Sequence, residues 1–276
     1  MLGVGAAAFH DIKTREIPDW ISYGMLAAGF GIRAMAALGA ATMSYFFSAF
    51  LGLGATYLLG TVMYYAKQWG GGDAKIIMAL GVIFATRPSF LPQTATPFLA
   101  ILFINMLIFG AIYGLLWGII LAWKNRKKFT TVAKQLLQEK RMVKTRIAAL
   151  VLAAVTFTAS FFLPDLFLRI SIMTFALLIL LYPYLWIYVK AVEKACLYKY
   201  LKPQQLTEGD WVEEDILVNK RVLYKAKNTG IEKEDIQKLI KARVKQVLIK
   251  EGIPFVPAFF FGLLATLLQI KIIAFP

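Results

Sequence analysis

Long apolar stretches constrain this chain more than any other feature of its sequence. Several of them run for about twenty residues, the length that an α-helix needs to cross the ~30 Å hydrocarbon core of a bilayer. The chain is 59% hydrophobic and only 17% charged, so it lacks the polar side chains that would cover a soluble core of this size. We therefore expect an all-α polytopic membrane protein.

The apolar stretches also outline the order of the parts along the chain. Eight are expected, at about residues 1–10, 20–38, 44–66, 74–86, 97–123, 147–163, 166–189 and 253–274. The first is too short to span, since its ten residues reach about half way across the hydrocarbon core. We expect five parts: a membrane core (1–123), a basic loop (124–146), two additional membrane helices (147–189), a polar domain (190–251) and a last membrane helix (252–276).

Lysine and arginine set the expected orientation, because loops rich in these residues stay in the cytoplasm. If the loops after the first, third, fifth and seventh segments are inside, 27 of the 31 basic residues lie on that side of the membrane, and the exceptions are Arg33, Arg87, Arg169 and Lys271. Residues 124–146 carry nine basic residues and one acid, a composition that also attracts anionic lipid. The lipid bilayer is thus an expected partner, and we expect no nucleic-acid partner. Asp11 and Asp73 both fall at the cytoplasmic membrane boundary.

The polar stretch at 190–251 has the features of a small cytoplasmic α+β domain before the last helix. Residues 215–218 and 221–224 predict a pair of strands. Residues 232–250 predict a helix, with an apolar face made of Ile236, Leu239, Ile240, Val244, Val247 and Leu248. We expect this face to pack on the strands or on the membrane.

The residue inventory limits the chemistry that the chain can perform. His10 is the only histidine and Cys196 the only cysteine, which argues strongly against histidine metal sites, serine or cysteine triads and tetracysteine zinc modules. Cys196 is expected to be a small packing residue at a helix end. We expect no metal and no cofactor, so any catalysis has to come from carboxylates.

Few acids lie near the expected membrane segments: Asp11, Glu16, Asp19, Asp73 and Asp165. The last is expected to be a turn or cap residue. The first three share a short loop with Lys13 and Arg15, and ion pairing within that loop would explain any of them. Spacing alone does not decide whether Asp11 or Asp19 is the partner of Asp73.

A charged glycine run, Gly70-Gly71-Gly72-Asp73-Ala74-Lys75, lies between two apolar segments. Three glycines weaken a helix by roughly 1 kcal/mol each, and an acid at membrane depth costs several more. Chemistry explains both features, because backbone without side chains lets a substrate strand approach and a carboxylate can activate water. Three other glycines are expected to be close helix contacts: Gly52, Gly54 and Gly60.

Two other functions fit the same residues. A cation-coupled membrane transporter would also break a helix with glycines and use Asp73 to bind a cation, although the sequence shows no inverted repeat and no second glycine break in a corresponding position. A scaffold protein without enzymatic activity would use the glycines only as helix contacts.

Three stretches together resemble the type IV prepilin peptidase family, in particular its archaeal prepilin and preflagellin peptidase branch. Residues 10–19, HDIKTREIPD, are similar to the family's first motif, an aspartate and a short basic stretch before Ile-Pro. Residues 70–75, GGGDAK, match its Gly-x-Gly-Asp signature and the lysine that follows it. Residues 252–255, GIPF, resemble its Ile-Pro-Phe-type element at the last membrane segment.

The resemblance implies a membrane-embedded aspartic endopeptidase with Asp11 and Asp73 as its catalytic pair. Two carboxylates that share one water titrate with split pKa values, so that one acts as base and the other as acid. Substrate binding or loop support is implied for Gly70, Gly71, Gly72 and Lys75. The implied partners are precursor pilins or archaellins, whose short basic leader peptide is removed at the cytoplasmic membrane face. Lys75 has an equal alternative as a cytoplasmic anchor at a helix end.

The chain also departs from the family pattern. The sixth and seventh apolar segments exceed the six helices expected of smaller archaeal members. The single cysteine leaves no tetracysteine zinc region, so methyltransferase activity is not carried over from the bacterial bifunctional enzymes. Presenilin-type proteases share the Gly-x-Gly-Asp signature, but their Pro-Ala-Leu element is missing from this sequence.

Overall fold

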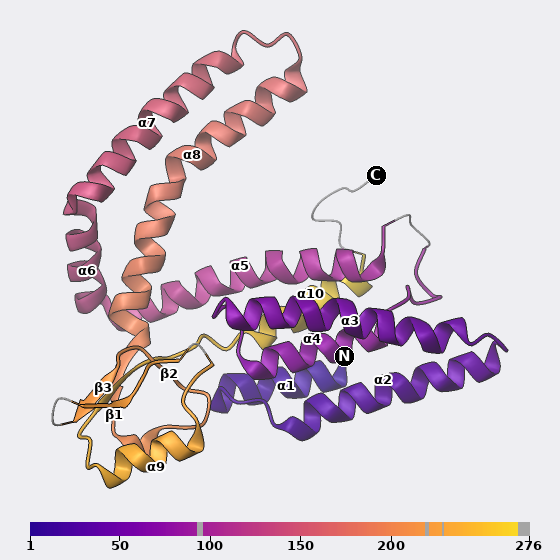
Figure 1. The fold of residues 1–276 in the computed structure, drawn as a ribbon. Helices are drawn as coiled ribbons and strands as arrows, with labels where there is room; N and C mark the ends of the chain where they lie inside the picture. The colour runs from indigo at the N-terminus through magenta and orange to yellow at the C-terminus, as the bar shows by residue number, and fades with distance from the viewer. Residues whose placement is uncertain (93–95, 219–220, 228, 270–276) are drawn as a thin grey trace. The chain divides into compact units, whose positions relative to one another are not determined.

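The computed structural model describes residues 1–92, 96–218, 221–227 and 229–269. It divides into two compact units. The first comprises Met1–Trp117 and Tyr200–Pro276, and the second comprises Gly118–Lys199. Figure 1 shows the helices and strands of both units.

Helices dominate both units. The first unit contains α1 (Leu2–Thr14), α2 (Asp19–Gly39), α3 (Ser44–Tyr65), α4 (Gly71–Ile83), most of α5 (Phe98–Lys124), and α10 (Val256–Leu267). The second contains the end of α5, then α6 (Arg126–Gln138), α7 (Lys140–Ser160), α8 (Leu166–Val192) and the π-helical turn η1 (Glu193–Leu197). Each of the predicted apolar segments contains a helix.

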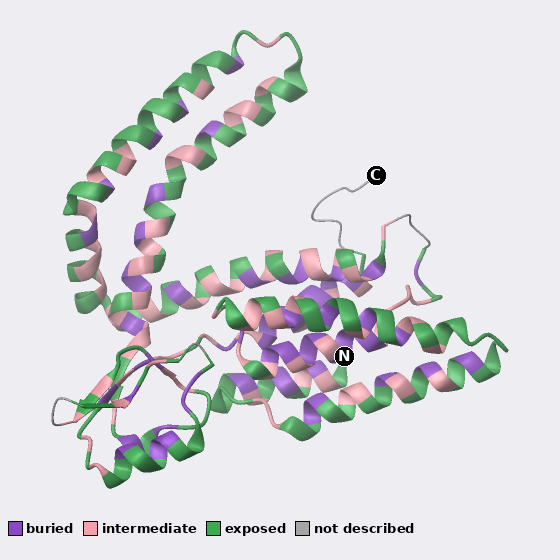
Figure 2. Cartoon of the chain, viewed as in Figure 1, coloured by how far each residue is buried: buried purple, intermediate pink, exposed green. Residues whose placement is uncertain are grey.

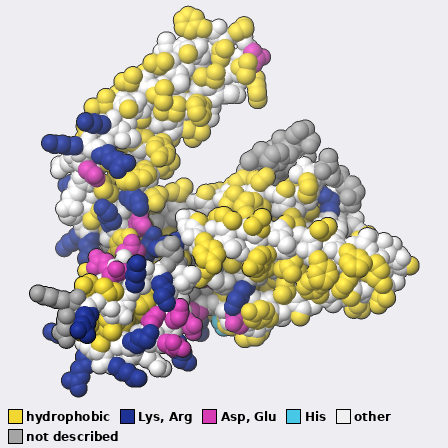
Figure 3. Space-filling view, viewed as in Figure 1, with side chains coloured by type: hydrophobic (Ala, Val, Ile, Leu, Met, Phe, Trp, Pro, Cys, Tyr) yellow, Lys and Arg dark blue, Asp and Glu magenta, His cyan; other side chains and the backbone are white. Residues whose placement is uncertain are grey.

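Five helices in the described part of the chain are long and apolar enough to cross a membrane: α2, α3, α5, α7, and α8 with η1. Hydrophobic side chains cover the visible faces of α2 and α3 and, in the second unit, of α7 and α8 (Figure 3). A protein in water rarely exposes such surfaces, whereas lipid tails cover them. The chain is a polytopic helical membrane protein. α1, α4 and α10 are shorter, at 13, 13 and 12 residues.

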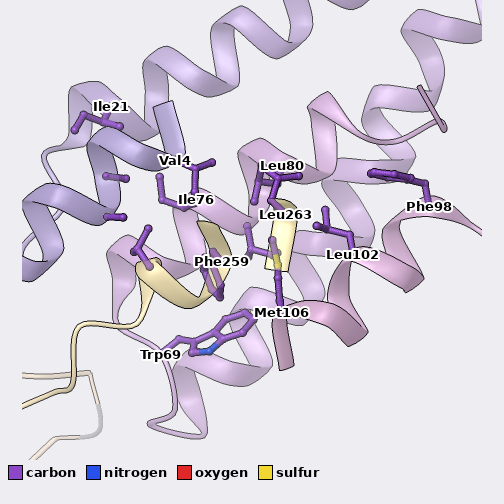
Figure 4. Close-up of a cluster of buried hydrophobic side chains, with 14 of the residues drawn as sticks. Val4, Ile21, Trp69, Ile76, Leu80, Phe98, Leu102, Met106, Phe259 and Leu263 are labelled. Atoms are coloured by element: carbon purple, nitrogen blue, oxygen red, sulfur yellow. The ribbon is translucent and has the colours of Figure 1, made fainter. Parts of the chain in front are cut away.

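The core of the first unit lies around α4 and α10, in both of which most residues are buried (Figure 2). Ile76 and Leu80 of α4 meet Val4 of α1, Leu102 of α5 and Phe259 of α10 in one cluster (Figure 4). A fully buried aliphatic or aromatic side chain contributes about 1.5–3 kcal/mol where water is the reference. Within lipid the gain comes from close packing instead.

Glycines bring α3 and α4 into contact. A Cβ on Gly52 would lie 2.1 Å from the carbonyl oxygen of Gly81, and one on Gly60 would lie 3.2 Å from Ile77. These two glycines are therefore the close helix contacts that the sequence predicts. Gly54 is not, because a Cβ there would meet nothing within 4 Å. Gly54 lies on the open face of α3, and sequence spacing alone could not distinguish it from the two glycines that face α4.

Arg33 of α2 closes the C-terminal end of α4. Its buried guanidinium donates hydrogen bonds to the carbonyl groups of Val82 and Ile83 in the last turn. The same guanidinium also donates to the Tyr45 carbonyl and to the hydroxyls of Ser48 and Thr86. The last carbonyls of a helix lack helical partners and carry partial negative charge. A cation there satisfies both needs, which explains a basic residue away from the predicted cytoplasmic loops.

A small sheet region precedes α10 in the chain. One sheet has the order β1-β5-β2, and a separate hairpin pairs β3 with β4. Their bounds are β1 (Tyr198–Leu201), β2 (Trp211–Val212), β3 (Ile216–Val218), β4 (Arg221–Tyr224) and β5 (Val247–Lys250). β2 is antiparallel to β5, with Val212 opposite Ile249. The hairpin confirms the predicted strand pair. A 3-10 turn, η2 (Pro203–Gln205), follows β1.

The predicted helix at 232–250 is wrong in its second half. α9 ends at Lys241 (Lys233–Lys241), and β5 follows it. Arg243 adopts a left-handed φ of 54°, and the amide of Val244 donates to the carbonyl of Leu239. This pattern is a Schellman-type helix end. Val247 and Ile249 are buried in alternation, so the residues interpreted as a helical face follow the two-residue period of a strand.

The second unit holds the basic stretch at 124–146, which is helical. α6 packs its Val132, Leu136 and Leu137 against a cluster with Ile187 of α8, as the helical pattern indicated. The rest of that stretch forms the start of α7 rather than a loop.

Asp165 is the cap residue that the sequence predicts, since its carboxylate accepts the Leu168 amide at 2.7 Å. Cys196 is buried and forms no disulfide.

Candidate active site

Asp11 lies in the last turn of α1 and is buried, with 5% of its surface exposed. Its Oδ2 accepts a hydrogen bond of 2.9 Å from the backbone N–H of Val256, the first residue of α10. The first amides of a helix have no helical partner, and the positive end of the helix dipole favours a carboxylate. The residue was expected in the loop after the first apolar segment, but the structure places it inside the helix.

Asp73 is the third residue of α4 and is also buried. Its Oδ2 accepts the Gly70 amide at 2.8 Å, the contact that an acid in the first turn makes with the residue that caps the helix. Gly71 and Gly72 are therefore the first residues of a helix and not a loop. The glycine run thus starts the helix and fixes the rotamer of the aspartate.

The two aspartates influence one another electrostatically, and both lie outside the five long helices. Burial raises the pKa of Asp11 to about 6, and the Val256 and Phe255 amides and the Arg15 charge oppose that rise. The pKa of Asp73 is raised to about 7, mainly by burial and then by the nearby negative charge of Asp11, while the Gly70 amide opposes the rise. Such a pair holds one proton between its carboxyl groups near neutral pH.

Gly72 allows the two motifs to pack against each other. A Cβ at this position would lie 2.8 Å from the Cδ1 atom of Ile17, the residue before the proline of the first motif. Gly70 and Gly71 have more room, with the nearest atoms 3.4 Å and 3.9 Å away. For Gly72, the close approach that glycine permits is therefore made by this chain's own Ile17.

Lys75 and Asp19 form an ion pair across α4 and α2. The ammonium group also lies 5.3 Å from the centre of the Tyr23 ring. Pairing of Asp19 with Lys13 or Arg15, which the loop charges indicated, is wrong. In the structure Asp19 contacts Lys75, whereas the charge of Asp11 acts on Asp73.

The third motif, residues 252–255, lies beside Asp11. Arg15 donates a hydrogen bond of 2.6 Å to the Gly252 carbonyl and lies 3.4 Å from the Glu251 carboxylate. The ring of Phe255 packs near Trp69, with their centres 6.1 Å apart. A Cβ on Gly110 of α5 would lie 2.5 Å from the Phe255 ring. The motif therefore connects α1, α5 and α10 around the first aspartate.

Among the described residues, no three His, Cys, Asp or Glu side chains gather closely enough to hold a metal ion. The arrangement of Asp11 and Asp73 is suited to moving protons, since one carboxyl ionises while the other keeps its proton.

In a comparison with known protein families, residues 1–115 match the model of the type IV leader peptidase family. The matched stretch is 115 of the chain's 276 residues and is similar to that family. No curated protein and no solved structure matches the chain. The match confirms the resemblance drawn from the first two motifs and supports a leader peptidase-like protease. Type IV leader peptidases act on pilin precursors, and the matched residues include both aspartates and the glycine run.

Sequence reasoning predicted Asp11 and Asp73 as the candidate pair but missed two groups around them. The Val256 amide is a backbone donor, which no side-chain inventory reveals. Its signal was the GIPF stretch at the start of a helix, where free amides are expected. Ile17, which packs on Gly72, was noted only as part of a motif. The glycine at position 72 was the signal, because a glycine in a helix can mark the place where a bulky side chain packs against the backbone.

Proposed function

We propose that the chain is a membrane-embedded aspartic endopeptidase that removes the short basic leader from type IV pilin-like or archaellin precursors at the cytoplasmic membrane face. The observation that carries this proposal is the buried pair Asp11 and Asp73, each fixed by a backbone amide and coupled to the other. The match of residues 1–115 to a leader peptidase family supports it.

The two carboxyl groups supply the proton transfers that hydrolysis of a peptide bond needs. The ionised aspartate takes a proton from water while the oxygen of that water attacks the carbonyl carbon, and the protonated aspartate donates to the carbonyl oxygen. When the C–N bond breaks, the aspartate that took the proton from water gives it to the leaving amine, and a hydroxyl of the tetrahedral intermediate returns a proton to the other aspartate as the carbonyl re-forms. The aspartates end with one proton between them, as they began. Gly70, Gly71, Gly72 and Lys75 support this site in the proposal.

The parts of the chain fit this proposal. Residues 1–123 form the protease core, 124–146 the basic cytoplasmic segment, 147–189 two additional membrane helices, 190–251 a cytoplasmic domain and 252–276 the last membrane segment. The archaeal branch of the family, with prepilin or preflagellin as substrate, is the version that the motifs favour.

A cleavage assay tests the proposal. The purified protein in nanodiscs is incubated with a tagged type IV pilin precursor and, separately, with a tagged archaellin precursor. Mass spectrometry should detect loss of the leader at the boundary before the apolar helix. If both precursors keep their full mass with folded protein present, the endopeptidase proposal is wrong.

Cleavage should depend on pH in a bell shape. Burial holds the two pKa values at about 6 and about 7, so the form with one proton on the pair predominates between them. Below this window both carboxyls become protonated and the base is lost. Above it both ionise and the acid is lost. We expect kcat/KM to be highest between about pH 6 and pH 7 and to fall on both sides; a flat profile from pH 4.5 to 8.5 would contradict a catalytic carboxyl pair.

The orientation makes a separate prediction. Single cysteines are introduced at exposed positions of 126–138 and of 221–224, in a chain whose Cys196 is replaced by alanine. Because the basic residues should remain inside, a thiol reagent that cannot cross membranes should label neither site in intact cells and both after permeabilisation. If both sites were labelled from outside intact cells, the predicted orientation would be wrong and the aspartates would lie on the opposite side of the membrane.

A further inference from the structure

Arg15 links the first motif to the chain segment that leads from the small sheet region into α10. β5 ends at Lys250, and Arg15 contacts the next two residues. It forms an ion pair with the Glu251 carboxylate and donates a hydrogen bond to the Gly252 carbonyl. Arg15 itself ends α1 in a left-handed conformation, with φ 59°, and its amide bonds to the carbonyl of Asp11. The arginine is therefore held at a fixed place one turn from the aspartate.

The same segment supplies the backbone donor to Asp11. Val256 follows Gly252 by four residues, and its N–H lies 2.9 Å from the aspartate Oδ2. An anchor at Gly252 therefore limits how far that N–H can move from Asp11. Arg15 thus acts on Asp11 in two ways, by its own charge and by holding the amide.

We propose that Arg15 is a positioning residue that keeps Asp11 ready to ionise, by anchoring the Glu251–Val256 segment whose amide binds the aspartate. The inference rests on the proposed protease function. It also makes the position of the sheet region matter for the chemistry, because the anchor lies between β5 and α10.

Several charged or titratable groups face these residues from the surrounding elements. Asp73 of α4 and Tyr113 of α5 interact with Asp11, and Arg15 also acts on Tyr113. Asp210 interacts with Glu16 and Glu251. His10 precedes Asp11 on α1. Of the charged side chains in this set, the Arg15 guanidinium is the one whose charge favours ionisation of Asp11.

Arg15→Gln tests the inference. It removes the charge and weakens the anchor, and both losses disfavour the ionised form of Asp11. We expect the acid limb of the kcat/KM profile to move to higher pH by about half a unit to one unit, which lowers the rate at pH 5 about 3- to 10-fold. Arg15→Lys keeps the charge and should retain most of the wild-type position. Lys13→Gln removes a neighbouring loop charge and should leave the limb in place.

The outcomes separate this inference from the proposed function. If the wild type cleaves and the acid limb of Arg15→Gln coincides with it, or if the rate falls equally at every pH, Arg15 does not position Asp11. If the wild type does not cleave, the function fails first. The inference is then judged by isotope-edited infrared titration of Asp11 in the Asp73→Asn protein, identified by its loss in Asp11→Asn. That titration must move to higher pH on Arg15→Gln for the inference to stand.

Discussion

Asp11→Asn and Asp73→Asn will each abolish precursor cleavage. Removing a general acid or base typically lowers a rate by 10²- to 10⁴-fold, and a pair that shares one proton loses both roles when either member becomes an amide. Asparagine keeps the shape and the acceptor oxygen, so the bonds from Val256 and Gly70 can persist. Processing by membranes that contain each variant is read as a gel shift of the precursor.

Two neighbouring acids provide matched controls for these variants. Asp19→Asn loses the ion pair with Lys75. The Asp19 side chain is 64% exposed and that of Lys75 is 35% exposed, and exposed ion pairs contribute at most about 1 kcal/mol to stability. Glu16→Gln changes an exposed loop acid. Both should retain most of the activity. If Asp73→Asn cleaved at the wild-type rate, the protease proposal would be wrong, and a transporter that binds a cation at Asp73 would become the leading explanation.

Gly52→Ala will destabilise the membrane core, whereas Gly54→Ala will not. The added methyl of Gly52→Ala meets the Gly81 carbonyl oxygen at 2.1 Å and Ala85 at 2.6 Å, so α3 and α4 must separate. Overpacking of this kind typically costs about 1–3 kcal/mol. Because α4 carries Asp73, cleavage should also fall. At Gly54 the methyl enters open space, and alanine favours the helix by up to about 1 kcal/mol.

Thermal unfolding in one detergent measures the Gly52 and Gly54 variants side by side. The expected result is a midpoint several degrees lower for Gly52→Ala and one equal to or above wild type for Gly54→Ala. Equal midpoints for the two variants would show that α3 and α4 do not pack as closely as this structure has them.

Most of the helices could be predicted because the apolar segments that form them are long enough to carry their own signal. The strand β5 could not, since Val247 and Ile249 fit the apolar face of the helix before them until Arg243 breaks it with a left-handed turn. Local sequence contains both possibilities. Pairing with β2, whose residues lie more than thirty positions earlier in the chain, selects the strand.

The candidate site was predicted in its acids but not in its supports. Asp11 and Asp73 are recognisable by type and by motif; spacing alone left Asp19 open, and the motif resemblance favoured Asp11. Lys75 takes Asp19 because α2 and α4 lie side by side. The amide of Val256 comes from residues 245 positions away in the chain, a distance across which no local pattern carries information.

The all-round burial of α4 has a consequence for how this protein can be handled. Protein side chains, and not lipid tails, form the surroundings of most of its residues, from Asp73 to Val82. The environment of the helix that bears Asp73 is therefore supplied by the protein itself. Exchanging lipid for detergent alters the surroundings of α2 and α3, whose outer faces are bare, while the neighbourhood of the second aspartate stays as it was in the membrane.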